Sequence, residues 1–508
     1  MTLAAQAAKN VGAIWLNLLV HGIVGFFLSP LILHRLGDEL FSLWVLIFSL
    51  TGYCGLLDLG IRAAVVRYTA KFAQLEDRSE LAKLISTALG FYGGMALLSL
   101  LLTGIGYFYL PVLFKVPTAD LNAARVLLLM AGTGVALSFP LNLFAAIIEA
   151  MQRFTYLGFG QIVVTLLRAL AIVIALASGG KLLAIGGITV GVNLLSSVLF
   201  TGIALKILPI RLSISRIDRR SFHKMIAYGA LAFLIPLADK LRFQSDAMVI
   251  GAFLSAPAIT SFSVAAKLVE YSGYAIRGVA QIFTPLSSQM HAAGDYASLR
   301  RILVTGNFAS ALISFPLCVI LLVLGKSILE VWVGPKYVPS YPILVLLAIP
   351  RSLYVAQSAS IKLLMGMGEH GRLAYVLLTE GIVNVALSIF LVRRAGLFGV
   401  ALGTTIPLAV TSLFFLPLHV SGKLQMPIRR YLRQTYLVPA LLCLPLALAL
   451  WAAERQYPAH SLRGLMVKLA FGAVIYGAGT GSVMLSRARS SGSWKKWVQT
   501  LRSEMRAF

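Results

Sequence analysis

Charged residues are scarce in this chain: they make up 12% of its 508 residues, whereas hydrophobic residues make up 59%. Soluble globular domains usually carry about twice that share of charge, because their surfaces face water. The composition therefore excludes a set of soluble domains. A mean hydropathy of +0.87 indicates that lipid surrounds most of the chain.

Cysteine is also rare, and the motifs of nucleotide-driven or hydrolytic chemistry are missing. Cys54, Cys318 and Cys443 are far apart in the sequence and each lies in an apolar run, which argues against a disulfide framework and a metal cluster. The chain has no Walker A loop, no H-E-x-x-H motif and no nucleophile elbow. We therefore expect no cofactor and no metal site, and we do not expect an enzyme.

Apolar runs of spanning length recur along the chain. In lipid, a run of about 20 apolar residues predicts a helix, because a helix satisfies its own backbone hydrogen bonds. No cleavage site follows the first run, which we interpret as a retained span and not as a signal peptide. The sequence predicts an all-α polytopic membrane protein with about 14 transmembrane helices, at about 11–33, 42–61, 84–110, 126–148, 155–177, 182–205, 225–253, 260–284, 302–324, 341–365, 374–392, 397–420, 435–452 and 464–486.

Basic residues outnumber acidic ones by 44 to 18, and their positions predict the orientation of the chain. If both termini are cytoplasmic, most lysines and arginines fall in cytoplasmic segments, as the positive-inside rule requires. The net charge of +26 then faces anionic lipid head groups, so no nucleic-acid partner is needed to explain it. The basic tail at 487–508 predicts an amphipathic helix on the inner leaflet.

The chain also contains a faint internal duplication. Residues 36–89 align without a gap with residues 254–307 at an offset of 218, and further on the offset becomes 216. The matches include Tyr53 with Tyr271, Gly55 with Gly273, Asp77 with Asp295, Gly180 with Gly396 and Gly187 with Gly403.

Each half of the duplication contains six predicted spans. Because six is an even number, both halves enter the membrane in the same sense, and such repeats enclose a cavity around an axis along the membrane normal. We expect two six-helix lobes related by pseudo-two-fold symmetry, plus two C-terminal helices. The predicted segments are a first lobe at 1–205, a basic cytoplasmic linker at 206–224, a second lobe at 225–420 and helices 13 and 14 at 435–486.

The stretch FLIPLADKLRFQSDAMVIGAFL, residues 233–254, places charges inside the seventh predicted span. In a continuous helix, Asp239, Arg242 and Asp246 lie on one stripe, with Lys240 and Gln244 on the stripe beside it. A charge that faces lipid at this depth costs about 2.5–3.5 kcal/mol or more. We favour a water-filled cavity around these side chains. The alternative is a self-neutralising set of ion pairs that locks two helices together.

Further ionisable residues lie in other predicted spans. The basic ones exceed the acidic ones, which suits an anionic cargo, and arginine binds phosphate oxygens with two parallel hydrogen bonds. We expect the substrate to contact Lys240, Arg242 and Gln244 together with Arg168, Lys267 and Arg351. Ion-coupling candidates are Asp239, Asp246, His21, Glu270 and Glu380. His21 falls opposite Asp239 at the offset of 218, and Lys267 with Glu270 could equally form a closed pair.

Three stretches in this order resemble the polysaccharide transporter, or oligosaccharide flippase, family of the multidrug/oligosaccharidyl-lipid/polysaccharide exporter superfamily. The resemblance covers nearly the whole chain and agrees with a plan of six, six and two spans. The stretches are HRLGDELFSLWVLIFSLTGYCGLLDLGIRAAVVRYTAKFAQ (34–74), DAMVIGAFLSAPAITSFSVAAKLVEY (246–271) and FTPLSSQMHAAGDYASLRRIL (283–303).

The resemblance implies a flippase that moves undecaprenyl-pyrophosphate-linked oligosaccharide units across the bacterial inner membrane by alternating access, driven by an ion gradient. Its partners would be the lipid-linked substrate, membrane lipids and, as further candidates, the polysaccharide polymerase or chain-length machinery. Two alternatives stay open. One is a multidrug cation exporter of the same superfamily, which would need an acidic cavity, and the other is a membrane glycosyltransferase or polymer ligase.

Overall fold

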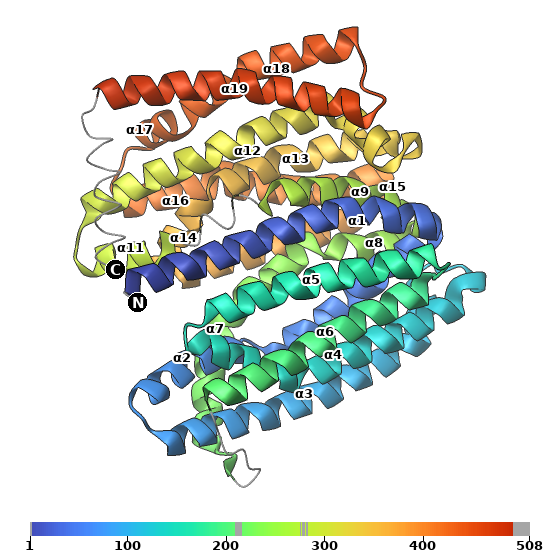
Figure 1. Cartoon of the computed structure of the whole chain (residues 1–508), viewed down its shortest axis with the longest axis vertical. Coiled ribbons are helices and arrows are strands. Elements are labelled where there is room, and N and C mark those ends of the chain that lie inside the picture. Colours follow the sequence, from blue (N-terminus) through green and yellow to red (C-terminus); the bar gives the residue numbers. More distant parts are fainter. Residues whose placement is uncertain (1–2, 209–215, 275, 277–279, 281–282, 491–508) are drawn as a thin grey trace. The chain divides into compact units, whose positions relative to one another are not determined.

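Helices make up most of the described chain (Figure 1). The computed structural model describes residues 3–208, 216–274, 276, 280 and 283–490, and these ranges contain no β-strand. The helices are α1 (Leu3–Cys54), α2 (Ile61–Gln74), α3 (Arg78–Leu113), α4 (Leu121–Ala150), α5 (Phe154–Ala177), α6 (Leu182–Ile207), α7 (Arg219–Phe243), α8 (Ser245–Phe253), α9 (Ala256–Ser272), α11 (Phe283–Ala292), α12 (Tyr296–Val333), α13 (Tyr341–Ala356), α14 (Ser358–Gly366), α15 (His370–Val410), α16 (Leu416–Lys423), α17 (Ile428–Leu432), α18 (Val438–Gln456) and α19 (Leu462–Ser490).

Two long helices each contain a glycine that leaves the helical path. Gly37 in α1 has a φ of 75° and Gly396 in α15 has a φ of 55°, values that favour glycine because it has no Cβ. Each of these helices therefore joins two predicted spans without a loop. Eleven helices of the described chain are long and apolar enough to cross a membrane. The all-α polytopic class is confirmed, whereas the predicted count of fourteen spans is not.

Large apolar side chains on the outside of the helices agree with a lipid environment. On α3, for example, Leu97 is 70% exposed, Phe108 71% and Val112 77%. A water-soluble protein would lose free energy by exposing so much apolar surface. Hydrocarbon around these helices removes that cost.

Helix boundaries follow the internal duplication closely. The helix α3 begins at Arg78 and α12 begins at Tyr296, 218 residues later. In both cases the preceding aspartate caps the helix: Asp77 Oδ1 accepts a hydrogen bond from the Glu80 backbone N–H at 3.0 Å, and Asp295 Oδ1 accepts one from Ser298 at 2.9 Å. The matched aspartates seen in the sequence therefore perform the same structural task in both halves.

Unusual backbone conformations also recur at the two offsets. Glu76 and Gly294, which differ by 218, both have positive φ, and so do Gln152 and Gly368, which differ by 216. The helix α4 ends at Ala150 and α14 ends at Gly366, again 216 apart. The two halves thus share the positions at which helices stop and turn.

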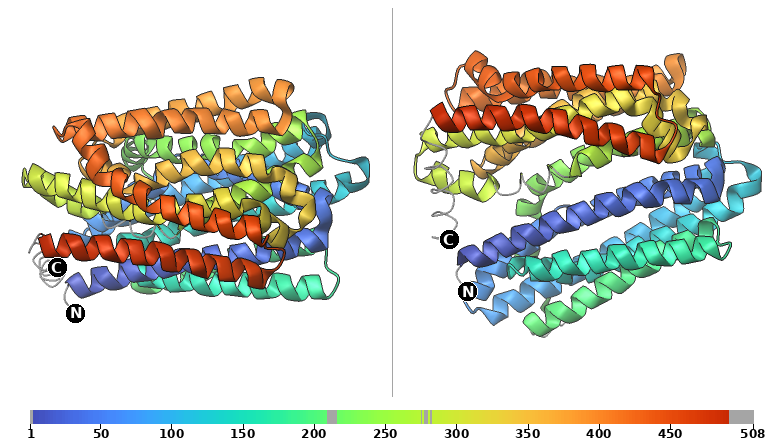
Figure 2. Two further views of the ribbon diagram at one scale, coloured as in Figure 1. Left: turned by 90° about the horizontal axis from the view of Figure 1, so that it is seen from above. Right: turned by 45° about the horizontal axis from the view of Figure 1, so that its top comes forward.

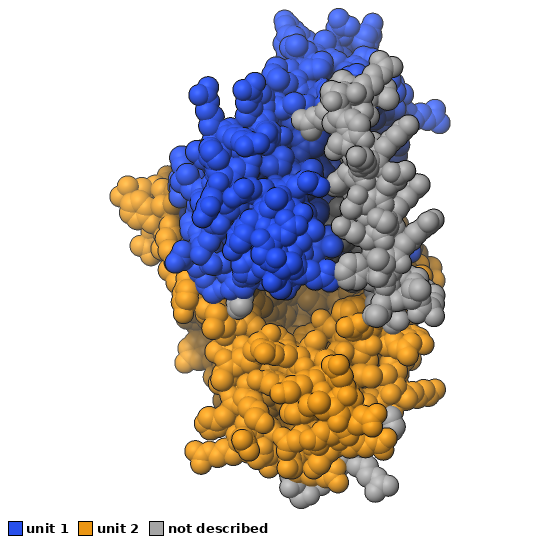
Figure 3. Space-filling model, turned by 90° about the vertical axis from the view of Figure 1, so that its left-hand side faces the viewer, with its two compact units in different colours: residues 1–19, 264–373, 405–508 blue, residues 20–263, 374–404 orange. Residues whose placement is uncertain are grey.

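The chain forms two compact units (Figure 3). Unit 1 contains residues 1–19, 264–373 and 405–508, and unit 2 contains residues 20–263 and 374–404. Segment 374–404 of α15 groups with unit 2, so the units do not follow the predicted boundaries at 205 and 225. The pseudo-symmetric lobes themselves stay a prediction.

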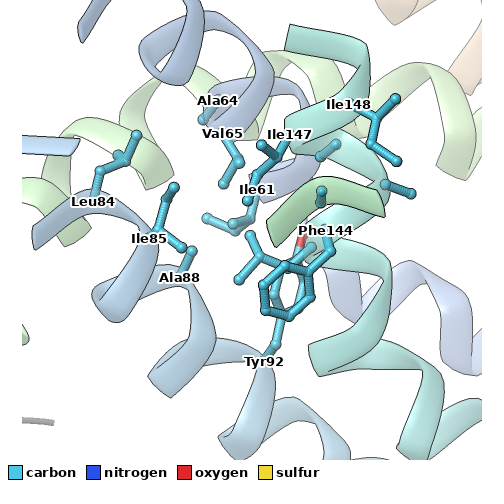
Figure 4. Close-up of a cluster of buried hydrophobic side chains, with 14 of the residues drawn as sticks. Ile61, Ala64, Val65, Leu84, Ile85, Ala88, Tyr92, Phe144, Ile147 and Ile148 are labelled. Atoms are coloured by element: carbon cyan, nitrogen blue, oxygen red, sulfur yellow. The ribbon is translucent and has the colours of Figure 1, made fainter. Parts of the chain in front are cut away.

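Unit 2 has an apolar core between α2, α3 and α4 (Figure 4). Ile61, Ile85 and Ile148 are fully buried there, and Phe144 packs into the same cluster. The helix α4 packs against both α3 and α6, and the three helices run together in the right-hand view of Figure 2. This bundle supports the turn between α1 and α2.

In unit 1, α12 packs against α13 and α18, and a buried polar network links its neighbours. The side-chain amide of Asn307 in α12 donates to Ser360 at 2.6 Å and to the Tyr431 hydroxyl at 2.9 Å. All three residues are fully buried. Because buried polar groups need partners, the network fixes how these helices meet.

Two predicted cytoplasmic segments are only partly described. Residues 209–215 of the predicted linker 206–224 lie outside the described residues, and the helix α7 begins within this linker at Arg219. Hydrogen bonds from the Ser221 backbone and side chain lower the pKa of the capping residue Asp218, because they favour its charged form. The predicted tail at 487–508 lies outside the described residues from residue 491 onward.

Removing the cap of α3 tests the role of the matched aspartates. We expect Asp77→Ala to lower the free energy of unfolding by about 1 kcal/mol, because the Glu80 N–H loses its acceptor. Asp77→Asn keeps an acceptor oxygen and serves as the control. Thermal unfolding of the purified protein in detergent measures both variants, and an unchanged midpoint for Asp77→Ala would contradict the capping role.

Candidate functional site

The charged seventh span is not one continuous helix. The helix α7 ends at Phe243, Gln244 has φ −126° and ψ −9°, and α8 begins at Ser245. The expectation of a single stripe from Asp239 to Asp246 is therefore wrong. Beside the break, the Lys240 carbonyl accepts hydrogen bonds from the Gln244 backbone N–H at 3.0 Å and from the Tyr53 hydroxyl at 3.0 Å.

Arg242, at the end of α7, forms a buried ion pair with Glu380 of α15. Arg242 Nε lies 2.6 Å from Glu380 Oε1, and the two side chains are only 1% and 3% exposed. Arg242 Nη1 also lies 3.4 Å from Asp239 Oδ1, whose side chain is 53% exposed. The guanidinium therefore bridges a buried and an exposed carboxylate.

A glycine allows this contact. A Cβ atom added to Gly381 would lie 2.8 Å from the Leu241 Cβ and 3.2 Å from the Ala238 carbonyl oxygen. The backbones of α7 and α15 thus approach at the residue next to Glu380. The short N–O distance of the ion pair depends on that approach.

This geometry agrees with the alternative interpretation of the span, in which ion pairs lock two helices together. A buried charge pair is stable only when both partners are present, and losing one partner costs about 3–5 kcal/mol. Arg242 is thus a structural residue in this conformation. Its predicted contact with a substrate stays a prediction.

Asp246, at the start of α8, has different surroundings from Arg242. It is 7% exposed, and its Oδ1 accepts a hydrogen bond from the Thr404 hydroxyl at 3.0 Å. Within the described part of the chain, Asp246 takes part in no ion pair. A buried carboxylate without a positive partner is costly in its charged form.

Further polar side chains of α15 lie near Gly403, the residue before Thr404. The two parts of α15 on either side of Gly396 pack closely, because a Cβ on Gly403 would lie 2.2 Å from the Ser388 Oγ. Ser388 Oγ donates to Asn384 Oδ1 at 3.4 Å, and Asn384 Nδ2 donates to the Arg242 carbonyl at 3.1 Å. Asn384 therefore joins Ser388 to the backbone of Arg242, the residue that pairs with Glu380.

Lys240 and Gln244 form a second, less buried contact on the same span. Lys240 Nζ lies 2.5 Å from Gln244 Oε1. A Cβ on Gly52 of α1 would lie 3.1 Å from both atoms, so the pair packs directly on the α1 backbone. Both side chains are half-buried, which leaves them more accessible than Arg242.

Two other predicted residues belong to unit 2. Arg168 on α5 is half-buried, and its Nη1 donates to Asn193 Oδ1 of α6 at 3.3 Å. His21 lies on α1 and is exposed. The predicted roles of both residues stay predictions.

The remaining predicted residues belong to unit 1. Lys267 on α9 is half-buried, and the exposed Glu270 accepts a hydrogen bond from the Tyr274 hydroxyl at 3.1 Å. The guanidinium of Arg351 on α13 lies 5.6 Å from the centre of the Tyr354 ring. Within the described ranges, no three residues among histidine, cysteine, aspartate and glutamate form a group that could hold a metal ion.

Sequence reasoning missed the uncharged polar residues of the site. Asn384 follows Glu380 by four positions, which places both on one face of α15, and this spacing was available in the sequence. Thr404 and Tyr53 carry no such signal. Polar residues of this kind are common in apolar helices, and only the fold brings these two to Asp246 and Lys240.

The helices define a multi-pass membrane protein, and the sequence comparisons indicate its relatives. Residues 122–342 match the family model described as "Polysaccharide biosynthesis protein". The chain is 23% identical over 399 residues to "Uncharacterized membrane protein EpsK" of Bacillus subtilis, a match that covers 78% of this chain and 79% of that protein. It is 21% identical over 389 residues to "Putative O-antigen transporter" of Shigella flexneri, covering 74% and 89%.

Solved structures share the fold. The lipid II flippase MurJ in an inward closed conformation superposes with a TM-score of 0.67 at 16% identity, covering 93% of this chain and 99% of MurJ. A MATE family transporter of the MOP superfamily in an inward-facing conformation gives a TM-score of 0.62 at 14% identity, covering 84% and 96%. The sequence matches confirm the predicted resemblance to polysaccharide transporters. The fold is the one shared by MurJ and the MATE family transporter.

A larger residue at Gly381 tests the close approach of α7 and α15. We expect Gly381→Val to lower the free energy of unfolding by about 1–3 kcal/mol, because its side chain would overlap Leu241 and separate Glu380 from Arg242. Gly93→Val on α3 is the matched control, since a Cβ there meets no atom within 4 Å. Equal thermal stability of the Gly381 variant and the wild type would contradict the packing described.

Proposed function

We propose that this protein is a flippase that translocates undecaprenyl-pyrophosphate-linked oligosaccharide units across the bacterial inner membrane by alternating access. The sequence match to polysaccharide biosynthesis proteins carries this proposal. The MurJ-like fold supports it, since it provides the helices of a transporter. Both termini would be cytoplasmic, as the charge bias predicts. A polysaccharide polymerase or chain-length protein would be a partner on the export route.

The pyrophosphate would bind to basic and polar side chains that water can reach. Lys240 and Gln244 are better placed for this than Arg242, because they are half-buried and Arg242 is enclosed with Glu380. Arg168, Lys267 and Arg351 are the other proposed contacts. Arg242 would join them only in a state of the cycle that separates it from Glu380.

Asp246 is the proposed site of ion coupling. Its burial and its single hydrogen bond from Thr404 favour a bound proton or sodium ion over a bare carboxylate. Glu380 is less suited, because Arg242 already neutralises it. Binding and release of the ion at Asp246 would change the charge beside the break at Gln244, where α7 and α8 meet.

The alternatives receive less support. A multidrug exporter would have the MATE fold, which this chain shares at 14% sequence identity. A shared fold at that identity does not indicate which substrate is transported. The sequence matches concern polysaccharide proteins instead. The match to a putative O-antigen transporter favours transport over a glycosyltransferase or polymer ligase.

Reconstituted vesicles test the proposed function. We expect the purified protein to move lipid-linked oligosaccharide between leaflets, measured as the fraction accessible to a membrane-impermeant glycosidase. Heat-inactivated protein is the control. If the vesicles export ethidium and leave the lipid-linked oligosaccharide in place, the multidrug alternative is correct and the flippase proposal is wrong.

A substitution of Asp246 tests the coupling step. We expect Asp246→Asn to remove the response of translocation to an imposed proton or sodium gradient, because the amide cannot carry the ion. Asp246→Glu should retain part of the response, since it preserves the charge. The rate of translocation with and without each gradient is the measurement, and an unaltered gradient response in Asp246→Asn would exclude this residue.

A further inference from the structure

Unit 2 contains a second polar site that the proposed function does not use. A partly open cavity of about 410 Å³ lies between the end of the α1 segment and the helices α2, α3 and α4. Its lining includes Asp58, Arg62, Tyr92, Ser138, Phe139 and Asn142. A volume of this size is typical of small-molecule sites, which usually range from about 300 to 1,000 Å³.

A tight turn positions Asp58 at this cavity. The 3₁₀ turn Gly55–Asp58 ends in two residues with positive φ, Leu59 and Gly60. A Cβ on Gly60 would lie 2.1 Å from the Gly229 carbonyl oxygen of α7, so only glycine fits there. The position of the Asp58 carboxylate is therefore set by backbone packing.

The hydrogen bonds of Asp58 leave one oxygen for a ligand. Its Oδ1 accepts from the Tyr92 hydroxyl at 2.5 Å and from the Arg62 backbone N–H at 3.3 Å. Among the described residues, no hydrogen bond to Oδ2 is present. An exposed carboxylate oxygen of this kind accepts hydrogen bonds from hydroxyl groups.

The other lining groups combine planar polar side chains with an aromatic wall. Arg62 Nη2 lies 2.9 Å from Glu149 Oε2, and both side chains are partly exposed. Asn142 Oδ1 accepts a hydrogen bond from the Ser197 hydroxyl at 3.3 Å.

An aromatic wall completes the cavity. The rings of Tyr92 and Phe139 lie nearly parallel, with centres 6.1 Å apart. Sugar rings are bound by such groups, because their hydroxyls need donors and acceptors and their C–H faces pack on aromatic rings.

The charges around the cavity disfavour an acidic ligand. Asp58 and Glu149 supply two carboxylates, whereas Arg62 supplies one guanidinium that Glu149 already binds. The helix α7 contributes no charge where it contacts Gly60, because its residues there are Gly229 and Phe233. The charged residue Lys224 of α7 lies 3.7 Å from Glu80 instead. The neighbourhood thus has an excess negative charge.

We propose that this cavity is a binding subsite for one uncharged sugar residue of the cargo. The inference rests on the proposed function, because a protein that transports an oligosaccharide needs a place where its sugars bind. Asp58 and Asn142 would accept and donate hydrogen bonds to the sugar hydroxyls, and Phe139 would pack against the ring. Uronic acids would be repelled by Asp58.

The test measures saccharide binding to the full-length protein in lipid nanodiscs. The probes are the methyl glycosides of glucose, galactose and N-acetylglucosamine, with glucuronate as the acidic probe. We expect at least one neutral probe to bind and glucuronate not to bind. Asp58→Asn should weaken neutral-sugar binding by about tenfold, the usual effect of losing a charge-assisted hydrogen bond.

Two further variants keep the test decisive. Val135→Trp fills the cavity from α4 and should abolish binding even if Asp58→Asn does not fold. Glu80→Gln, which removes a carboxylate of unit 2 outside the cavity, should bind as the wild type does. Absence of neutral-sugar binding by the wild type, equal binding by Val135→Trp, or binding of glucuronate as tightly as a neutral sugar would each overturn the inference.

The binding test and the transport test can fail independently of each other. If the protein binds neutral sugars through this cavity but does not translocate lipid-linked oligosaccharide, the proposed function is wrong, and the cavity is a saccharide site that serves no transported cargo. If it translocates the lipid-linked substrate and the cavity variants bind as the wild type does, only the subsite is wrong.

Discussion

The buried ion pair between Arg242 and Glu380 is the interaction on which the arrangement of unit 2 depends. Two charges removed from water are stable only when they face each other at short distance, and here Gly381 makes that distance possible. The pair explains why segment 374–404, far along the chain, belongs to the same compact unit as α7 and α8. It also explains why an arginine is tolerated at the depth of a membrane span.

This pairing divides the charges of the seventh span between two tasks. Arg242 and Glu380 neutralise each other and fix the helices, whereas Asp246 stays without an ion pair in the described chain and depends on Thr404. Asn384 contacts the backbone of Arg242, so the ion pair and the region of Asp246 are connected through α15. A change in the charge of Asp246 would therefore act beside a rigid contact and at a break in the span.

Much of the fold could be predicted from the sequence, and part of the site could not. Apolar runs gave the helices, and matched residues such as Asp77 and Asp295 gave the repeat, because both signals are local or periodic. The sequence predicts separate spans on either side of Gly37 and of Gly396, whereas one kinked helix crosses each glycine. A glycine in the sequence does not reveal whether a loop or a kink follows. The partner of Arg242 lies 138 residues away, and the choice between a cavity and an ion pair depended on that contact.

A double-mutant cycle on Arg242 and Glu380 tests the central claim most directly. The free energy of unfolding would be measured for Arg242→Met, for Glu380→Leu and for the double variant. The account predicts that each single variant loses about 3–5 kcal/mol, because it leaves one buried charge without a partner, and that the double variant loses far less than the sum. Additive losses would contradict the account, since they would mean that the two side chains do not stabilise each other.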